Sequence, residues 1–186
     1  LYPFSDYSAR AQKDIIYAYY GSKDYVSAEA AADRYIRIYP RGEDVDYAYY
    51  LRGLSQMNQN RTFLQRIFPV NIALRDPGIL VDAFYSFRDL VQFYPQSQYA
   101  PDAKQRMIFL RNLFAENELQ IAKFYMRRGA YQAAINRADF ILSHYPKTPQ
   151  VKDALIILVK ANRKIGLNQA AERAELVLQQ NFTSES

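Results

Sequence analysis

Residues that could do catalytic chemistry are few in this chain, and their spacing does not bring them together. His144 is the only histidine and cysteine is absent, which excludes a paired-histidine metal site, a histidine relay and a thiolate nucleophile. Acid pairs such as Glu116 with Glu118 lie two positions apart, so they point to different faces of a helix. The sequence also has no glycine-rich phosphate loop and no serine elbow. We therefore expect a protein that is not an enzyme and that uses no metal or other cofactor.

Binding chemistry is better represented, because the chain carries 17 tyrosines and 11 phenylalanines but no tryptophan. Tyr19 and Tyr20 are adjacent, and neighbouring helix positions diverge by about 100°, so these two rings cannot both point into a core. We predict that the excess rings line a groove close to Arg34 and Arg37. Such a groove suits a peptide that carries aromatic side chains and a carboxylate, with which guanidinium groups form paired hydrogen bonds.

The elements that must position these side chains are paired helices. In the stretch 115–146, Ala122 and Ala134 allow two helices to approach closely, Gly129 breaks the chain between them, and Tyr145-Pro146 ends the second. This spacing resembles the tetratricopeptide repeat. In its second helix Ala134 and Ala138 face the core, which turns Arg137 toward the edge, where we expect its hydrogen-bond donors to be free.

The same Tyr-Pro pair recurs four times, at 2–3, 39–40, 94–95 and 145–146, at intervals that fit a repeat of about 34 residues with insertions. It predicts an all-α solenoid in which helix pairs stack into a right-handed superhelix over 1–186. The first helix of the 115–146 pair is expected to start early and to run from about 99 to 126. The other helices are expected at about 8–20, 25–38, 44–59, 80–93, 148–165 and 168–180. On the first we expect Ile15, Ile16 and Tyr19 to point inward, with the following turn at Gly21-Ser22.

An insertion at 60–78 interrupts the second repeat. It is too apolar to remain in water, so we expect it to fold back on the solenoid, and Asp76 and Pro77 to open the next helix as its cap and first turn. The longest purely apolar run, 154–159, is far shorter than the roughly 20 residues that span a bilayer, so no transmembrane helix is expected.

Several segments in order along the chain resemble the BamD family. They are YPFSDYS, DIIYAYY, AADRYIRIYP, DYAYYLRGL, RDP, YPQSQYAPDAKQRMIFLRN and RRGAYQAAINR. Members of that family are lipid-anchored tetratricopeptide proteins at the periplasmic face of the outer membrane, in the β-barrel assembly machinery of Gram-negative bacteria. The family's lipidated cysteine and first hairpin have no counterpart here, so we expect an N-terminal hairpin to be missing and membrane contact only through an anchor outside this sequence.

The resemblance implies a non-catalytic scaffold. Its N-terminal repeats, 1–95, would recognise the C-terminal targeting strand of unfolded outer-membrane proteins. Its C-terminal repeats, 96–186, would hold the periplasmic (POTRA) domain of the barrel subunit BamA, with accessory Bam lipoproteins alongside. The candidate client-binding residues are Tyr2, Tyr7, Tyr19, Tyr20, Arg34 and Arg37, and the candidate BamA-binding residues are Arg128, Asn136 and Arg137.

Three alternatives stay open at this point. Each tyrosine of the client set could serve core packing instead. The chain could be a general periplasmic repeat adaptor with no part in barrel assembly. The formal charge of +5 and the pI of about 9.3 would also permit an electrostatic binder of nucleic acid or anionic lipid, although the charge is spread along the chain and we expect no nucleic-acid partner. Steep loss of binding with salt would identify that last class.

Overall fold

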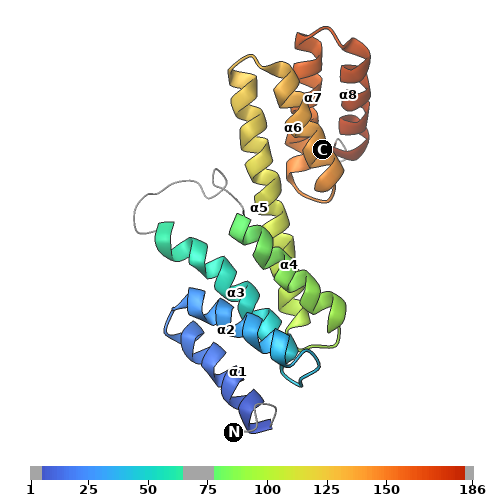
Figure 1. The fold of residues 1–186 in the computed structure, drawn as a ribbon. Coiled ribbons are helices and arrows are strands. Elements are labelled where there is room, and N and C mark those ends of the chain that lie inside the picture. Colours follow the sequence, from blue (N-terminus) through green and yellow to red (C-terminus); the bar gives the residue numbers. More distant parts are fainter. Residues whose placement is uncertain (1–5, 65–77, 183–186) are drawn as a thin grey trace. The chain divides into compact units, whose positions relative to one another are not determined.

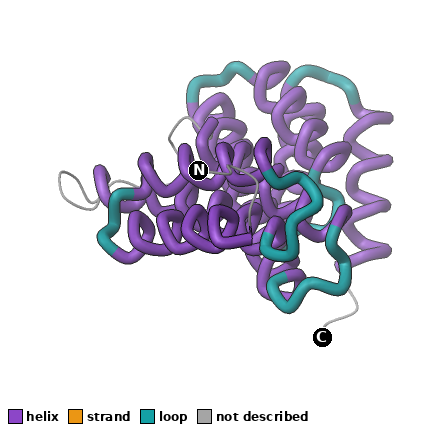
Figure 2. Tube along the Cα trace, turned by 60° about the horizontal axis from the view of Figure 1, so that its bottom comes forward, coloured by secondary structure: helices purple, strands orange, loops and turns teal. Residues whose placement is uncertain are grey.

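The computed structural model describes residues 6–64 and 78–182, with side chains described over 7–59 and 78–182. Within these ranges the chain forms eight α-helices and no strand, which confirms the all-α prediction (Figures 1 and 2). The helices are α1 (Asp6–Gly21), α2 (Tyr25–Ile38), α3 (Val45–Leu64), α4 (Gly78–Phe93), α5 (Ala100–Arg127), α6 (Tyr131–His144), α7 (Gln150–Lys164) and α8 (Asn168–Phe182). None of these helices is long and apolar enough to cross a membrane.

Successive helices pack on one another, as expected for a tetratricopeptide-like array. The described helices fall into two compact units: 6–64 with 78–110, and 111–182. In the first unit α1 packs on α2, α2 on α3 and α3 on α4; in the second α6 packs on α7 and α7 on α8. The division falls within α5, which is one continuous helix, as its lack of an internal breaker predicted. The functional division at residue 95 and the hand of the superhelix stay predictions.

The predicted glycine turn at Gly129 is confirmed, and a second glycine, Gly166, makes the turn between α7 and α8. Gly129 and Gly166 adopt φ values of +71° and +80°, the left-handed conformation that glycine tolerates without strain. The turn after α1 differs, because α1 continues through Gly21 and the left-handed residue is Lys23, at φ 65°. Asp24 then caps α2, its Oδ1 accepting a hydrogen bond from the Ser27 backbone N–H at 3.2 Å.

The core of the first unit is built from alanines and large rings on facing helices. Ala28, Ala32 and Tyr35 are buried on α2, as predicted. On α1 only one of the three predicted inward residues is right, because Ile16 is fully buried whereas Ile15 is 47% exposed and Tyr19 is also exposed. Adjacent helix positions diverge by about 100°, so the two isoleucines cannot both face α2 and α3, on which α1 packs, and Ile16 is the one that is buried.

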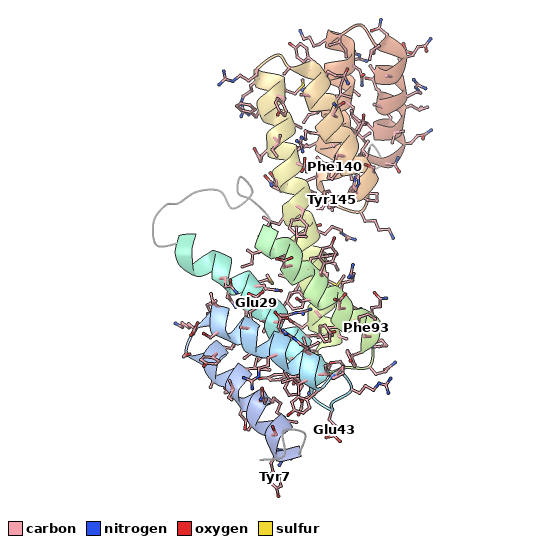
Figure 3. The ribbon with its side chains drawn as sticks, viewed as in Figure 1. Tyr7, Glu29, Glu43, Phe93, Phe140 and Tyr145 are labelled. Carbon is pink, nitrogen blue, oxygen red and sulfur yellow. The ribbon has the colours of Figure 1, made fainter. Side chains whose placement is uncertain are left out.

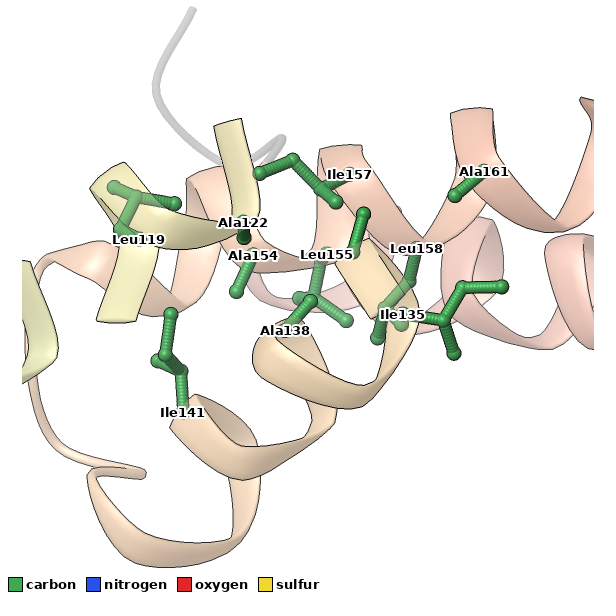
Figure 4. Close-up of a cluster of buried hydrophobic side chains, with 11 residues drawn as sticks. Leu119, Ala122, Ile135, Ala138, Ile141, Ala154, Leu155, Ile157, Leu158 and Ala161 are labelled. Carbon is green, nitrogen blue, oxygen red and sulfur yellow. The ribbon is translucent and has the colours of Figure 1, made fainter. Parts of the chain in front are cut away.

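The core of the second unit confirms the predicted hairpin (Figure 4). Ala122 of α5 and Ala134 of α6 have no exposed surface, so these helices meet at close range. The buried cluster consists of Leu119, Ala122, Ala134, Ile135, Ala138, Ile141, Ala154, Leu155, Ile157, Leu158 and Ala161. The predicted stripe on α6 is therefore its core-facing side.

The insertion is shorter than predicted, because α3 extends to Leu64 instead of ending near residue 59 and α4 already begins at Gly78. Residues 65–77 lie outside the described residues, and with them the proposed cap at Asp76 and first turn at Pro77.

Candidate functional site

The side chains with catalytic potential do not assemble in the parts of the chain that the structure describes. No three residues of the kinds that bind metals come together there. His144 ends α6 with its ring stacked on Phe140, the ring centroids 3.9 Å apart, and its Nδ1 lies 2.9 Å from the Ser143 Oγ. The histidine is thus a residue of the helix end, and the candidate sites are binding surfaces.

Tyr7 and the two candidate arginines lie at one end of the α1–α2 pair. Tyr7 is 86% exposed and points away from the start of α1 (Figure 3). The Tyr39 hydroxyl donates a hydrogen bond of 3.0 Å to the Ser8 Oγ, which ties the end of α2 to the start of α1. Because Arg37 is only two residues before Tyr39, it lies at the same end of the helix pair as Tyr7.

Arg34 and Arg37 are one helical turn apart on α2, and both are exposed. Neither forms an ion pair with any residue that the structure describes. By contrast, the described arginines that α3, α4 and α5 contribute to this unit are each paired with a carboxylate. Arg52 pairs with Asp33, Arg88 with Asp89 and Arg106 with Asp102. The two guanidinium groups of α2 therefore keep donors available for an external anion.

Tyr19 and Tyr20 lie at the opposite end of the same helix pair. The Tyr20 ring is 5.5 Å from the Tyr25 ring, centroid to centroid, and its hydroxyl accepts a hydrogen bond of 3.1 Å from the Asn58 Nδ2. Burial raises the pKa of Tyr20 above its ordinary value. Tyr20 thus joins α1 to α3, while Tyr19 remains exposed.

The candidate client residues consequently form two groups. Tyr25, which touches Tyr20, precedes Arg37 by 12 residues of α2, a rise of about 18 Å along the helix axis. An extended strand covers this distance in roughly five or six residues. Tyr2 lies outside the described residues.

Sequence reasoning missed an aromatic cluster between α3 and the start of α5. The Tyr99 ring stacks on Tyr50 with centroids 4.9 Å apart and lies 5.5 Å from Tyr47. The Tyr50 hydroxyl donates a 2.7 Å hydrogen bond to Asp102, which also binds Arg106 one turn later. Burial raises the pKa of Tyr47 to about 12, and the neighbouring Tyr99 is the second-largest cause. Tyr47 and Tyr50 are three positions apart, a spacing that could have indicated a shared helix face. It could not have indicated that Tyr99 is their partner.

Sequence reasoning also missed a chain of polar side chains across α2, α3 and α4, here called the polar seam. Arg52 donates to Asp33 Oδ1 and to Ser86 Oγ, both at 2.9 Å. Ser86 donates to the Gln56 side chain at 2.7 Å, and Gln56 donates to Glu29 at 2.8 Å. The side chain of Arg52 is only 18% exposed, so the seam fixes three helices from within.

On the second unit, Arg137 is not as free as its position on α6 predicted. Its Nη1 donates a 3.0 Å hydrogen bond to the Glu118 Oε2 of α5, so the expectation of a wholly unoccupied fork is wrong. The reason is that α5 carries a carboxylate opposite the edge of α6, which the spacing within α6 alone does not reveal. The Nε and Nη2 of Arg137 have no partner among the described residues.

The other two candidate partner residues are exposed. Arg128 lies in the turn between α5 and α6 with its guanidinium carbon 5.4 Å from the centroid of the Phe124 ring. Asn136 accepts a 3.1 Å hydrogen bond from Gln132 one turn earlier. Arg137 is the seventh residue of α6 and Arg128 precedes that helix, so the three side chains are spread along one helix and its preceding turn.

The similarity to known proteins covers almost the whole chain. The family described as "YfiO: Outer membrane lipoprotein" matches residues 1–177. The outer membrane protein assembly factor BamD of Vibrio cholerae is 41% identical over 180 residues, which are 97% of this chain and 75% of that protein. BamD of Neisseria meningitidis serogroup A is 40% identical over 181 residues, 97% of this chain and 68% of that protein.

BamD of Xylella fastidiosa is 38% identical over 180 residues, 97% of this chain and 61% of that protein. The chain thus spans between three fifths and three quarters of the length of these relatives. They are described as assembly factors, which agrees with the prediction of a non-catalytic protein. The chain belongs to the family of outer-membrane lipoproteins that contains the assembly factor BamD.

Proposed function

We propose that this chain is a scaffold of the outer-membrane β-barrel assembly complex. Its first unit binds the C-terminal strand of unfolded outer-membrane proteins, and its second unit binds the periplasmic (POTRA) domain of BamA, with accessory lipoproteins alongside. Membership of the BamD family supports the assembly role.

The observation that carries client binding is the pair of unpartnered arginines on α2. Arg34 and Arg37 are exposed on one helix, one turn apart, and make no ion pair in the described chain. The exposed Tyr7 ring lies at the same end of the helix pair. A terminal carboxylate bound by the two guanidinium groups would leave the last aromatic side chain of an extended peptide within reach of Tyr7. Side chains five or six residues earlier would reach the other end of the helix pair, where Tyr19 is exposed.

The test is a peptide of about ten residues that ends in alternating aromatic residues and a free carboxylate. Arg34→Ala combined with Arg37→Ala should weaken its binding about tenfold, because two partly exposed ionic contacts contribute up to about 1 kcal/mol each. The melting temperature should stay close to the wild-type value, since both side chains are exposed. Fluorescence anisotropy of a labelled peptide measures the affinity.

Two controls sharpen this test. Arg88→Ala combined with Lys104→Ala also removes two positive charges from exposed positions of the first unit. This variant should bind the peptide with almost unchanged affinity. The same peptide with an amidated C-terminus should bind wild-type protein about as weakly as the unmodified peptide binds the Arg34/Arg37 variant. Equal affinity of that variant and wild type for the free-acid peptide would refute the carboxylate contact. Equal losses for unrelated anions would instead indicate general anion binding.

Arg137 is the residue that supports docking of BamA on the second unit. This side chain keeps two donors without partners at the exposed edge of α6, an arrangement suited to a carboxylate of the partner. If the pair is buried in the complex, Arg137→Ala should weaken binding of the isolated POTRA domain by about 2 to 5 kcal/mol. Reversal to glutamate should weaken it further, and a reciprocal reversal of the partner's acid should restore part of the loss. Wild-type affinity of Arg137→Ala in calorimetry would contradict this assignment.

A further inference from the structure

The ion pair between Arg137 and Glu118 is unequal in exposure. The side chain of Glu118 is 17% exposed, while that of Arg137 is 43% exposed. Glu118 lies on α5 directly before Leu119, which is almost completely buried, so the carboxylate starts from the flank of the packed α5–α6 hairpin. The carboxylate is thus the sheltered partner, and the guanidinium is the partner that reaches solvent.

The contact uses one corner of the guanidinium group. The 3.0 Å hydrogen bond joins Nη1 of Arg137 to Oε2 of Glu118, and no described residue binds Nε or Nη2. Nε and Nη2 together form the edge that binds a carboxylate through two parallel hydrogen bonds. The intramolecular bond therefore leaves the bidentate edge available.

A free arginine side chain loses considerable rotamer freedom when a partner immobilises it. Glu118 removes part of that freedom before any partner arrives, because it fixes the end of the side chain against α5. We propose that Glu118 is a positioning residue that holds the Nε–Nη2 edge of Arg137 outward for a carboxylate of the docking partner. This inference rests on the proposed docking role of Arg137 and adds a residue to it.

A different effect of Glu118 would have the opposite sign. Its negative charge repels an incoming carboxylate, so a Glu118 that merely competes for Arg137 would lower affinity, and its removal would raise it. Two substitutions separate these effects. Glu118→Ala removes both the charge and the acceptor, whereas Glu118→Gln removes the charge but keeps a side-chain oxygen that can accept from Nη1.

The experiment measures binding of the full 186-residue chain to the purified POTRA domain of BamA by calorimetry. We expect Glu118→Ala to raise the dissociation constant about three- to tenfold. The reason is that the long side chain of Arg137 would then have to be ordered during binding. We expect Glu118→Gln to bind within about twofold of wild type or tighter, since positioning remains and repulsion is gone. Asp153→Ala is the matched control: it breaks the 2.8 Å ion pair with Lys123 in the same unit and should leave affinity unchanged.

A double-mutant cycle distinguishes a positioning role of Glu118 from a purely structural one. A structural role would lower the affinity whether or not Arg137 is present. If Glu118 acts through Arg137, then Glu118→Ala added to Arg137→Ala should cause no further loss of affinity. Thermal melts of each variant show whether the fold is intact, and Glu118→Gln keeps the test usable if Glu118→Ala unfolds.

The outcomes separate the two proposals. Wild-type or tighter binding by Glu118→Ala would overturn the positioning role, as would an equal loss from this substitution in the presence and absence of Arg137. Unchanged affinity in Arg137→Ala alone would instead overturn the docking role on which the positioning role rests.

Discussion

Replacing Gly53 with alanine would place a methyl group against the ring of Phe87. A Cβ built on Gly53 lies 2.7 Å from the Cε1 and 2.8 Å from the Cζ of that ring, well inside ordinary carbon contact. Phe87 is completely buried on α4, and its ring also lies against Tyr50, with centroids 6.2 Å apart. The ring therefore cannot swing into solvent, and α3 and α4 would have to separate locally.

Two terms of opposite sign decide the magnitude. Overpacking of this kind costs about 1 to 3 kcal/mol, because helices or rotamers must shift. Alanine in place of glycine within a helix returns up to about 1 kcal/mol through backbone entropy. Because the ring atoms would lie only 2.7 and 2.8 Å from the new Cβ and the ring is buried, the cost should fall in the upper part of its range, about 2 to 3 kcal/mol. We therefore expect Gly53→Ala to lower the free energy of unfolding by about 1 to 2 kcal/mol, and the melting temperature by roughly 2 to 8 °C for a chain of this length.

Circular dichroism during thermal and urea unfolding measures this loss. Gly21→Ala is the matched control, since nothing lies within 4 Å of its Cβ position and its φ is not positive, so it should be neutral or stabilising. Phe87→Leu removes the clashing ring atoms and should destabilise a Gly53→Ala background less than it destabilises wild type. A Gly53→Ala protein that melts as high as Gly21→Ala would refute the reasoning.

Two further predictions concern the first unit. Arg52→Ala should destabilise the fold by about 1.5 to 3 kcal/mol, because the lost guanidinium binds Asp33 and Ser86 from a largely buried position, whereas exposed Arg88→Ala should cost under about 0.5 kcal/mol in the same urea titration. The raised pKa of Tyr47, about 12 against 10.0 for an ordinary tyrosine, means that the folded chain holds this proton more tightly than the unfolded chain. Its contribution to stability should thus be complete below pH 10 and be lost between pH 10 and 12, and Tyr47→Phe should show a smaller fall in melting temperature across that window. Equal slopes for the two proteins would contradict the assignment.

The helices could be predicted from sequence because their signals are local. These signals are small residues on a helix face, such as Ala122 or Ala134, glycine between two helices, and proline after a helix. Each depends only on residues that are close together in the sequence. Gly129 shows this directly, since the position requires a positive φ. Lys23 shows the limit: the chain places an ordinary residue in that conformation although Gly21 is two positions away.

The surfaces were less predictable, because they depend on pairs that are far apart in sequence. Period alone could not decide whether Ile15 or Ile16 faces the core, since the answer depends on which side of α1 its neighbours cover. The Glu118 partner of Arg137 is 19 residues away on another helix. Tyr20 carried the same signal as Tyr19, yet its contact with Asn58 makes it a packing residue. Side-chain pairing across helices is the information that a single sequence lacks.

The polar seam has a consequence for how the array assembles. Arrays of similar helix pairs can stack in a wrong order or register while folding, because one apolar face fits another almost as well as its true neighbour. Polar partners are less interchangeable. A slipped α3 would leave Arg52 without Asp33, and Gln56 without Glu29, inside the packed helices, where a stranded polar group costs about 1 to 3 kcal/mol and a charge more. The hydrogen bonds of the polar seam therefore form only when α2, α3 and α4 pack in their native order and register. Exchanging one of these helices for its equivalent from another repeat should disrupt assembly even where the apolar faces match.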